Sequence, residues 1–396
     1  MDRELKVGII GFGGAGIALY NQFNSIKGCK TLAIYDPKQG GLDRARKLSK
    51  TMFITNSIDK FLASDIDIVA ICSPDKTHAD YIVMSLNAGK HVICEKPLTD
   101  SIEGCKRVLQ AERQSVGCVA AVQHQMRFLP LYIRMKELIK SGNLGRISYI
   151  EGYYVHNLTT RARLYDNWRF IDNATPLVYS GSHFVDLFRW ILEDEVVEVA
   201  AMANNIAFPE YPESDLNVVL FRFRSGVLGK VVTAFGAARP QDHSVRIYGS
   251  EKSIENNLLF TKDGGFTVFA APFLKRKISA NLNFRTKVRA NIEDCKAVIF
   301  GKIFEKLMKI YKIGKGDYSI NSYPIRLYEH NFAVNASVSD FVNAIRSGQK
   351  PKCTLLDSAK TIATSLAGVE SYRTGKFVQV ARYWISEFKT GREKII

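Results

Sequence analysis

The chain has 396 residues, enough for about two domains of 100–200 residues each. It contains 46% hydrophobic and 24% charged residues and no apolar run near the roughly 18 residues of a membrane-spanning helix, so its composition excludes a disordered or membrane-spanning chain. More than half of the net charge of +16 comes from one stretch, 275–315, where 12 Lys or Arg outnumber 3 Asp or Glu, which indicates a local basic patch.

Short apolar runs alternate with amphipathic segments in the first third of the chain. We predict strands over 5–10, 31–35, 66–72, 91–95 and 118–123, with helices over 77–90 and 100–114. Runs that are short, apolar and mostly unalternating are expected of a parallel sheet covered on both faces. The alternation with helices therefore indicates a doubly wound α/β domain over 1–124.

The pattern changes after about residue 125. Longer strands with partial alternation are predicted within 147–157, 195–207, 215–236 and 244–249, and helices over 180–192 and 335–348. This pattern is typical of an α+β domain with a large, mostly antiparallel sheet. We therefore predict a second domain over 125–396 that serves substrate binding and oligomerisation.

The N-terminus and the cysteines indicate a compartment. The first residues turn directly into a strand and show no signal-peptide pattern. The seven cysteines are odd in number, and no two have C-x-x-C spacing. We expect reduced thiols in a cytoplasmic protein, with neither a disulfide frame nor a metal site.

A glycine motif, Gly11-x-Gly13-x-x-Gly16, follows the first predicted strand and opens a helix. In a dinucleotide-binding unit such glycines allow a tight turn, close approach of a pyrophosphate and close helix–strand packing. Asp36 ends the second predicted strand, 20 residues after Gly16, where an acid would hold the ribose 2′-hydroxyl. The pattern predicts NAD, while Lys38 nearby leaves NADP as an alternative.

Two further segments end predicted strands. In "ICSPDKTHAD", Pro74 stops a strand, Thr77 is a candidate helix cap, and His78 taken alone is typical of a surface or cap histidine. In "VICEKPLTDS", Lys96 stands at the carboxyl end of a parallel strand, the edge where open α/β sheets bind ligands. A strand-end lysine is usually only solvated, but here it is a candidate proton donor or acceptor. Pro97 restrains the backbone beside it, and Asp100 or Ser101 can cap the next helix.

The segment "YSGSHFVDLFRWIL" predicts an amphipathic helix. His183 and Asp186 are three residues apart and share one helical face. Taken alone, such a pair is more often a local hydrogen bond than catalytic machinery.

Together these segments resemble the glucose–fructose oxidoreductase and inositol dehydrogenase family (Gfo/Idh/MocA). The resemblance spans most of the chain and includes the glycine motif, "CSPDKTHAD", "CEKPLTDS", "QMRFLP", "SGSHFVDLFRW" and the ending from "FVNAIRSGQKPK". It implies a Rossmann domain and an α/β domain whose open sheet supports dimers or tetramers. It also implies NAD(P)-dependent oxidation or reduction of sugars, sugar nucleotides or cyclitols, with the motif lysine beside the nicotinamide.

The resemblance assigns the site residue by residue. Lys96 and His183 match the family's catalytic lysine and histidine, but Tyr179 stands where the family often has an aspartate, which makes Tyr179 a candidate proton donor. The predicted cofactor-binding residues are Gly11, Gly13, Gly14, Ala15, Gly16, Asp36, Ser73, Pro74, His78, Glu95 and Lys96. The predicted substrate-binding residues are Arg127, Trp168, Arg169 and Asp186, and Asp186 is also a candidate for orienting His183.

An insertion over about 273–318 departs from the resemblance. Within 296–313 an apolar face of Ile, Phe, Leu, Met and Tyr lies opposite a lysine-rich face. Such a helix packs on its own domain or a second subunit, or lies on an anionic membrane, and we favour protein over lipid. Binding to nucleic acid is a weaker third option.

We therefore predict an NAD(P)-dependent dehydrogenase or reductase that acts on CH–OH groups of a sugar-type substrate, without a metal. A redox-neutral glycosidase or epimerase with tightly held NAD, and a non-catalytic dinucleotide-binding scaffold or sensor, are the alternatives. Retention of both Lys96 and His183 favours catalysis.

Overall fold

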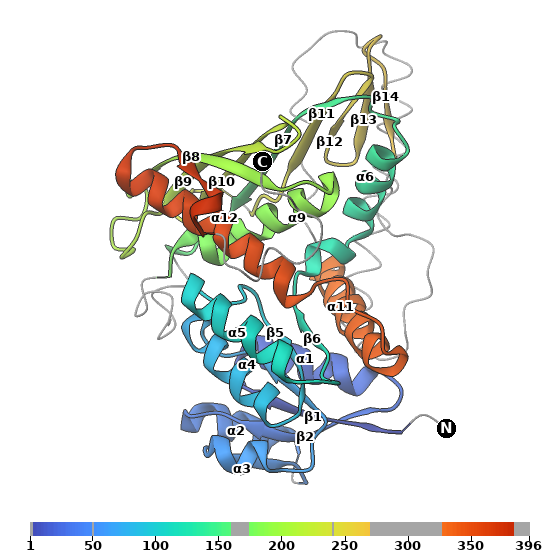
Figure 1. Cartoon of the computed structure of the whole chain (residues 1–396), viewed down its shortest axis with the longest axis vertical. Coiled ribbons are helices and arrows are strands. Elements are labelled where there is room, and N and C mark those ends of the chain that lie inside the picture. Colours follow the sequence, from blue (N-terminus) through green and yellow to red (C-terminus); the bar gives the residue numbers. More distant parts are fainter. Residues whose placement is uncertain (1–2, 50, 160–173, 240, 270–326, 384–396) are drawn as a thin grey trace.

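The computed structural model describes residues 3–49, 51–159, 174–239, 241–269 and 327–383 (Figure 1). Two sheets organise these residues, one with six strands near the N-terminus and one with nine strands. The predicted insertion at 273–318, the segment 296–313 and Cys295 lie outside the described residues, so their roles stay predictions.

The first sheet is entirely parallel and has the order β3-β2-β1-β4-β5-β6. Its strands are β1 (Leu5–Ile10), β2 (Cys29–Tyr35), β3 (Phe53–Thr55), β4 (Ile68–Ile71), β5 (His91–Cys94) and β6 (Ala120–Val122). The helical segments between them are α1 (Gly14–Ser25), α2 (Gln39–Leu48), α3 (Ile58–Leu62), η1 (Asp75–Thr77), α4 (His78–Asn87) and α5 (Ile102–Gln114). This is the order of a dinucleotide-binding Rossmann sheet.

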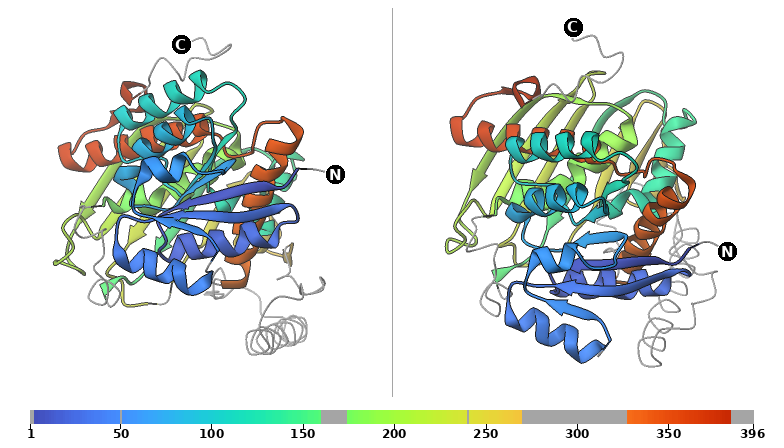
Figure 2. Two further views of the ribbon diagram at one scale, coloured as in Figure 1. Left: turned by 90° about the horizontal axis from the view of Figure 1, so that it is seen from below. Right: turned by 60° about the horizontal axis from the view of Figure 1, so that its bottom comes forward.

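Helices cover both faces of this sheet, which explains why its strands are apolar without alternation. Side chains such as Ile10 and Val69 pack with α3, α4 and α5 on one face. Val7 and Ile9 point to the other face and pack with Phe23 of α1. That second face is completed by α11 (Leu327–Ser347), which comes from near the other end of the chain (Figure 2).

The second sheet has the order β14-β13-β12-β11-β7-β10-β9-β8-β15 and is antiparallel except for the β7–β10 pair. Its strands are β7 (Ile147–Val155), β8 (Val196–Asn204), β9 (Leu216–Phe223), β10 (Leu228–Ala234), β11 (Val245–Gly249), β12 (Lys252–Glu255), β13 (Leu258–Thr261), β14 (Phe266–Val268) and β15 (Val378–Gln379). The helical segments around it are η2 (Gln125–Phe128), α6 (Pro130–Lys140), η3 (Leu177–Gly181), α9 (Ser182–Leu192), α12 (Leu355–Thr374) and η4 (Val380–Tyr383).

The two faces of the second sheet differ. Inward residues such as Val219 and Val231 are fully buried under α9 and α12. On the other face Met202 is 80% exposed and Leu220 is 50% exposed. Strand residues thus alternate between core and surface, as expected of a sheet with one covered face.

The α/β fold class is confirmed, including both kinds of sheet. The five strands predicted for the first domain are present, β1 with the predicted ends and the other four with shifted ends, and the short strand β3 was not predicted. The position of Ser101 as a cap is confirmed, because its hydroxyl accepts a hydrogen bond from the Gly104 N–H at 3.1 Å. Thr77 stands at the N-cap position of α4, but its hydroxyl makes no capping hydrogen bond and lies instead 2.7 Å from the Pro74 carbonyl oxygen and 2.8 Å from Ser73 Oγ.

Candidate active site

The glycine turn between β1 and α1 has the geometry of a pyrophosphate cradle. Gly11 has a φ of +83°, which L side chains rarely adopt, and a Cβ on Gly16 would lie 2.1 Å from the Gly11 carbonyl oxygen. A Cβ on Gly13 or Gly14 would meet nothing within 4 Å, so this side of the turn is open. No side chain caps α1, and its N-terminal N–H groups therefore suit an anion.

Asp36 at the end of β2 stabilises this turn. Its Oδ2 accepts a hydrogen bond from the Phe12 N–H at 2.8 Å, and its Oδ1 accepts one from the Lys38 N–H at 2.8 Å. The Phe12 carbonyl in turn accepts a hydrogen bond from Arg44 Nε at 2.9 Å. Asp36 thus holds the glycine loop from the position where the sequence predicts a ribose contact. Arg44 was not predicted, because nothing in the sequence connects it to position 12.

The loops after β4 and β5 are joined by His78. Its ring is fully buried, with Nδ1 2.7 Å from the Pro97 carbonyl oxygen and Nε2 2.9 Å from the Ser73 carbonyl oxygen. Burial lowers the pKa of His78. His78 is therefore neither a surface nor a cap residue, as it would be taken alone, but a link between two predicted cofactor loops. Burial also raises the pKa of Glu95, against the opposing charge of Lys96.

Lys96 reaches from the first domain to the segment before α9. Its Nζ donates a hydrogen bond to the Tyr179 carbonyl at 3.0 Å and lies 4.0 Å from the centroid of the Tyr179 ring. The peptide bond between Lys96 and Pro97 is cis. The structure thus brings together two of the three predicted catalytic residues.

His183 lies four residues after Tyr179, in the first turn of α9, and is buried. Its ring stacks on the Tyr154 ring from β7, with centroids 5.7 Å apart and planes at 7°. Tyr154 also contacts the His243 ring, at a centroid distance of 4.5 Å. Stacking fixes the plane of the His183 imidazole, and Tyr154 is a site residue that the sequence did not reveal. Trp168 and Arg169 lie outside the described residues, so their substrate contacts stay predictions.

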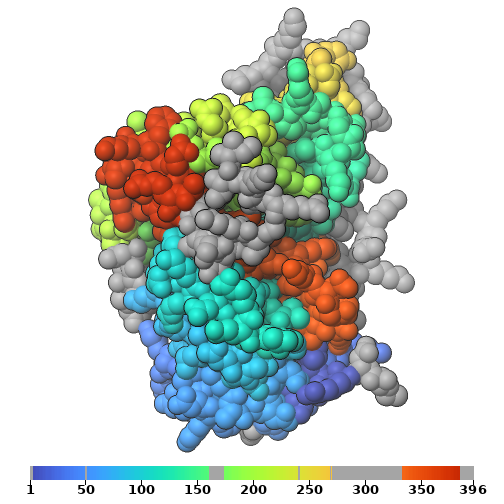
Figure 3. All heavy atoms as spheres, viewed as in Figure 1, coloured from blue at the N-terminus to red at the C-terminus, as the bar shows by residue number. Residues whose placement is uncertain are grey.

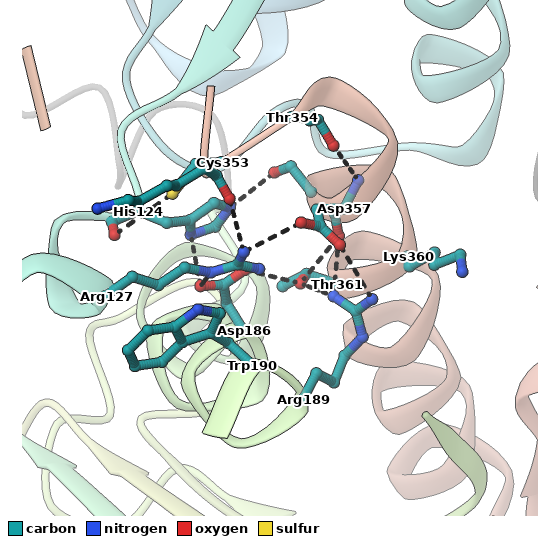
Figure 4. A network of polar contacts seen from close by, with 12 residues as sticks. His124, Arg127, Asp186, Arg189, Trp190, Cys353, Thr354, Asp357, Lys360 and Thr361 are labelled. Carbon is teal, nitrogen blue, oxygen red and sulfur yellow. Dashed lines mark hydrogen bonds and ion pairs between the residues drawn. The ribbon is translucent and has the colours of Figure 1, made fainter. Parts of the chain in front are cut away.

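Arg127 and Asp186 form a buried bidentate pair (Figure 4). Arg127 Nε donates to Asp186 Oδ2 at 2.8 Å and Nη2 donates to Oδ1 at 2.6 Å. Arg127 Nη1 also donates to the Lys352 carbonyl and to Asp357 Oδ2, both at 3.0 Å. Burial raises the pKa of Asp186, but the charge of Arg127 and then of His124 outweighs it and holds that pKa below its ordinary value. These contacts link η2, α9 and the start of α12.

His124 extends the same network. Its Nε2 lies 2.8 Å from Ser358 Oγ, and its Nδ1 lies 3.6 Å from Asp186 Oδ2. Burial lowers the pKa of His124 to about 4, although the charge of Asp186 opposes the shift. The imidazole is therefore neutral near pH 7, and it connects the end of β6 to α9 and α12.

A cavity of about 260 Å³ lies beside this network rather than at Lys96 and His183. Its lining residues are Arg127, Lys136, Arg189, Trp190, Glu193, Asp194, Glu195 and Asp357. The cations on its wall are paired, for Arg189 Nε lies 2.6 Å from a Glu195 carboxylate oxygen and Lys136 Nζ lies 2.8 Å from one of Glu193. Within the described residues, no cluster of three or more His, Cys, Asp or Glu side chains could hold a metal ion. Every helix of the described part is too short or too polar to cross a membrane.

Known proteins show the same architecture. An inositol 2-dehydrogenase of Rubrobacter xylanophilus is 27% identical over 257 residues, which are 64% of this chain and 72% of the relative. The scyllo-inositol 2-dehydrogenase (NAD+) of Bacillus subtilis is 28% identical over 262 residues, 64% of this chain and 74% of the relative. The crystal structure of a Lactobacillus plantarum myo-inositol 2-dehydrogenase superposes with a TM-score of 0.74 at 19% identity and covers 95% of this chain and 99% of that protein.

Two family models match successive parts of the chain. Residues 5–124 match the oxidoreductase family with an NAD-binding Rossmann fold, and residues 132–255 match the Gfo/Idh/MocA C-terminal domain. The glycine cradle, Lys96 and Tyr179 lie within these matches, and Arg127 lies between them. The chain therefore belongs to the Gfo/Idh/MocA family of NAD-binding oxidoreductases.

Proposed function

We propose that this protein is an NAD-dependent dehydrogenase that oxidises a ring hydroxyl of a cyclitol or a similar polyol. The observation that supports it most directly is the contact of Lys96, next to the cofactor loops, with the turn η3 directly before the helix that carries His183. The relatives named as inositol dehydrogenases indicate the cyclitol class.

The residues present fit the cofactor. The open side of Gly13 and Gly14 leaves room for a pyrophosphate, and Asp36, directly after β2, stands where an acid would hold the ribose. Bound NAD would supply the hydride acceptor. Transfer of a hydride from the substrate carbon leaves an alcohol proton to be removed, and His183 and Lys96 are the groups at the site that can take or share it.

Stacking on Tyr154 fixes the plane of the His183 ring, so its nitrogens have a defined direction. Lys96, as an ammonium, can donate a hydrogen bond to the reacting oxygen and stabilise the alkoxide that develops as the hydride leaves. His183 can take the alcohol proton, and Lys96 can stabilise the developing negative charge. Losing either side chain should therefore slow the reaction without preventing NAD from binding.

Arg127 and Asp186 support this arrangement. Both are almost completely buried, and the Asp186 oxygens accept hydrogen bonds from Arg127. Asp186 lies one turn beyond His183 on α9, so the pair fixes the helix that carries the histidine. We assign both residues to positioning α9 instead of to the substrate contact that the resemblance implied.

Oligomer and compartment stay predictions. The exposed apolar residues on the open face of the second sheet, such as Met202 and Leu220, support a homodimer or homotetramer formed through that face. Light scattering of the purified protein measures this directly. A cytoplasmic location is the inference from its cysteines, and the competing membrane contact through 296–313 is tested by flotation with anionic liposomes.

Activity is tested by following NADH at 340 nm with myo-inositol, scyllo-inositol and monosaccharides. Lys96→Met and His183→Ala should each lower kcat by about 10²–10⁴, the range for a positioned acid–base group, while the Kd for NAD stays within about threefold. Lys106→Met, at an exposed lysine of α5, is the matched control and should keep full activity.

The outcomes separate the alternatives. NADH formation that depends on Lys96 and His183 supports a dehydrogenase. Conversion of a glycoside or sugar epimer without net NADH would assign a redox-neutral enzyme. Tight NAD binding without turnover of any polyol would favour a scaffold or sensor and contradict the proposal.

A further inference from the structure

The turn that precedes α9 is not α-helical. Residues Leu177–Gly181 form a π-turn, in which backbone hydrogen bonds close one residue later than in an α-helix. Such turns change the direction of carbonyl groups and occur often at functional sites. Here the carbonyl of Tyr179, in the middle of the turn, accepts the hydrogen bond from Lys96 Nζ.

The ring of the same residue makes a second contact with the lysine. Lys96 Nζ lies 4.0 Å from the Tyr179 ring centroid, well within the distance of a cation–π interaction. The ring is itself supported by an edge contact with Phe235, which is fully buried, at 6.4 Å and 73°. The ammonium therefore has an acceptor and an aromatic face from one residue, and both contacts leave out the phenol oxygen.

We propose that Tyr179 is a positioning residue for Lys96, which acts through its main-chain carbonyl and its ring face and not as a proton donor through its hydroxyl. The ring thus stands where the family resemblance predicts a carboxylate, and it attracts the ammonium without adding a negative charge. The functional part of this inference rests on the role of Lys96 in the proposed dehydrogenase.

The two contacts favour the charged form of Lys96, so removing the ring should make its proton easier to lose. Tyr179→Phe keeps both the carbonyl and the ring face, whereas Tyr179→Leu keeps only the carbonyl. Tyr179→Asp instead introduces a carboxylate, which should hold the proton more strongly. Glu95 and His78 also interact electrostatically with Lys96. Both residues are the same in every variant, so differences in the Lys96 titration midpoint between variants come from position 179.

The primary experiment needs no substrate. Protein labelled with ¹³C at lysine Cε is titrated by NMR, and the Lys96 signal is assigned with Lys96→Met. The titration midpoint should stay within about 0.3 pH units in Tyr179→Phe, fall by about 0.4–1.5 in Tyr179→Leu and rise in Tyr179→Asp. Equal midpoints in the Phe and Leu variants would overturn the ring contact, whatever the enzyme acts on.

Enzyme kinetics of the same variants test whether the Tyr179 hydroxyl takes part in the reaction. Tyr179→Phe should keep kcat within about threefold, and Tyr179→Leu should lower kcat by about tenfold and move the alkaline limb of the kcat/KM profile to lower pH, because Lys96 acts in its protonated form. A hundredfold loss of kcat in Tyr179→Phe, with an unchanged Lys96 titration and unchanged NAD affinity, would assign proton transfer to the hydroxyl and overturn the proposal. Absence of activity in the wild-type protein would contradict the proposed function while leaving the NMR result intact.

Discussion

The nucleotide turn and the junction around α9 are built in different ways. At the turn, Gly11, Gly16 and Asp36 act through backbone shape and main-chain hydrogen bonds, and all three lie within one short stretch of sequence. At the junction, Lys96, Arg127 and Asp186 act through side chains that contact segments far away in the sequence. The nucleotide turn thus needs a particular backbone conformation, which nearby residues provide. The junction depends on side-chain partners that only the folded chain brings together.

This difference decides what could be predicted. A glycine at φ +83° and one whose Cβ would collide with a carbonyl are required by the backbone itself, so the motif is visible in the sequence. The carboxylate partners of Arg127 are 59 and 230 residues away, and no periodicity in the sequence indicates such pairs. The sequence therefore predicted Arg127 and Asp186 as site residues but not the pair that they form.

Local sequence patterns also decided which strands and helices could be predicted. Strands β1 and β5 were predicted because their apolar runs are bounded by clear stops. The three residues of β3 are too few for a pattern, and the π-turn has no compositional signal. The helix over 335–348 was predicted, but its apolar face does not show which of the two sheets it covers.

The largest effect should follow from breaking the buried pair at the junction. Asp186→Ala leaves the Arg127 guanidinium, 4% exposed, without its main partner, and should lower the free energy of unfolding by about 3–5 kcal/mol. Urea denaturation measures this. Glu137→Ala, which breaks an exposed pair with Arg134, is the matched control and should cost less than about 1 kcal/mol.

Because Asp186→Ala could fail to fold, the double variant Arg127→Met/Asp186→Leu provides a second test. It removes both charges together and should recover much of the lost stability. Its affinity for NAD should equal that of the wild type, since the turn does not depend on the junction. A double variant as unstable as Asp186→Ala would show that the pair is not the source of the effect.

The second prediction uses pH to probe the same region. The folded-state pKa of His124, about 4, lies below the 6.5 of an unperturbed histidine, so this residue contributes its full stability above pH 6.5. As the pH falls from 6.5 towards 4, the unfolded chain binds a proton that the folded chain does not, and stability should fall by roughly 3 kcal/mol.

The measurement is the free energy of unfolding between pH 7.5 and 4 in the wild type and in His124→Gln. Asp186 and Arg127 face His124 in both proteins, and the buried His78 and the partly buried His91 are common to both. The difference between the two curves therefore isolates His124, and parallel curves would contradict the prediction.

The smallest effect concerns the nucleotide turn. Asp36 should favour NAD over NADP by at least tenfold, about 1.4 kcal/mol, because its carboxylate repels a 2′-phosphate. Calorimetric titration should show that Asp36→Asn narrows this preference and that Lys38→Ala, without the neighbouring cation, widens it. Tenfold tighter binding of NADP by the wild type would exclude Asp36 as the selector.

The position of α11 has a consequence for synthesis of the protein. Val334, Val338 and Phe341 of this helix share a core with the first sheet, where α11 contacts α1 and β5, and in Figure 3 the helix surface, in orange, adjoins the blue and teal surface of the first domain. About 220 residues separate Val122, the last strand residue of that sheet, from the end of α11. At 5–20 residues per second, a ribosome needs roughly 10–45 s to make them. During that time one face of the nascent sheet is covered by α1 but not yet by α11, and a chaperone that holds exposed apolar surfaces would act in this interval.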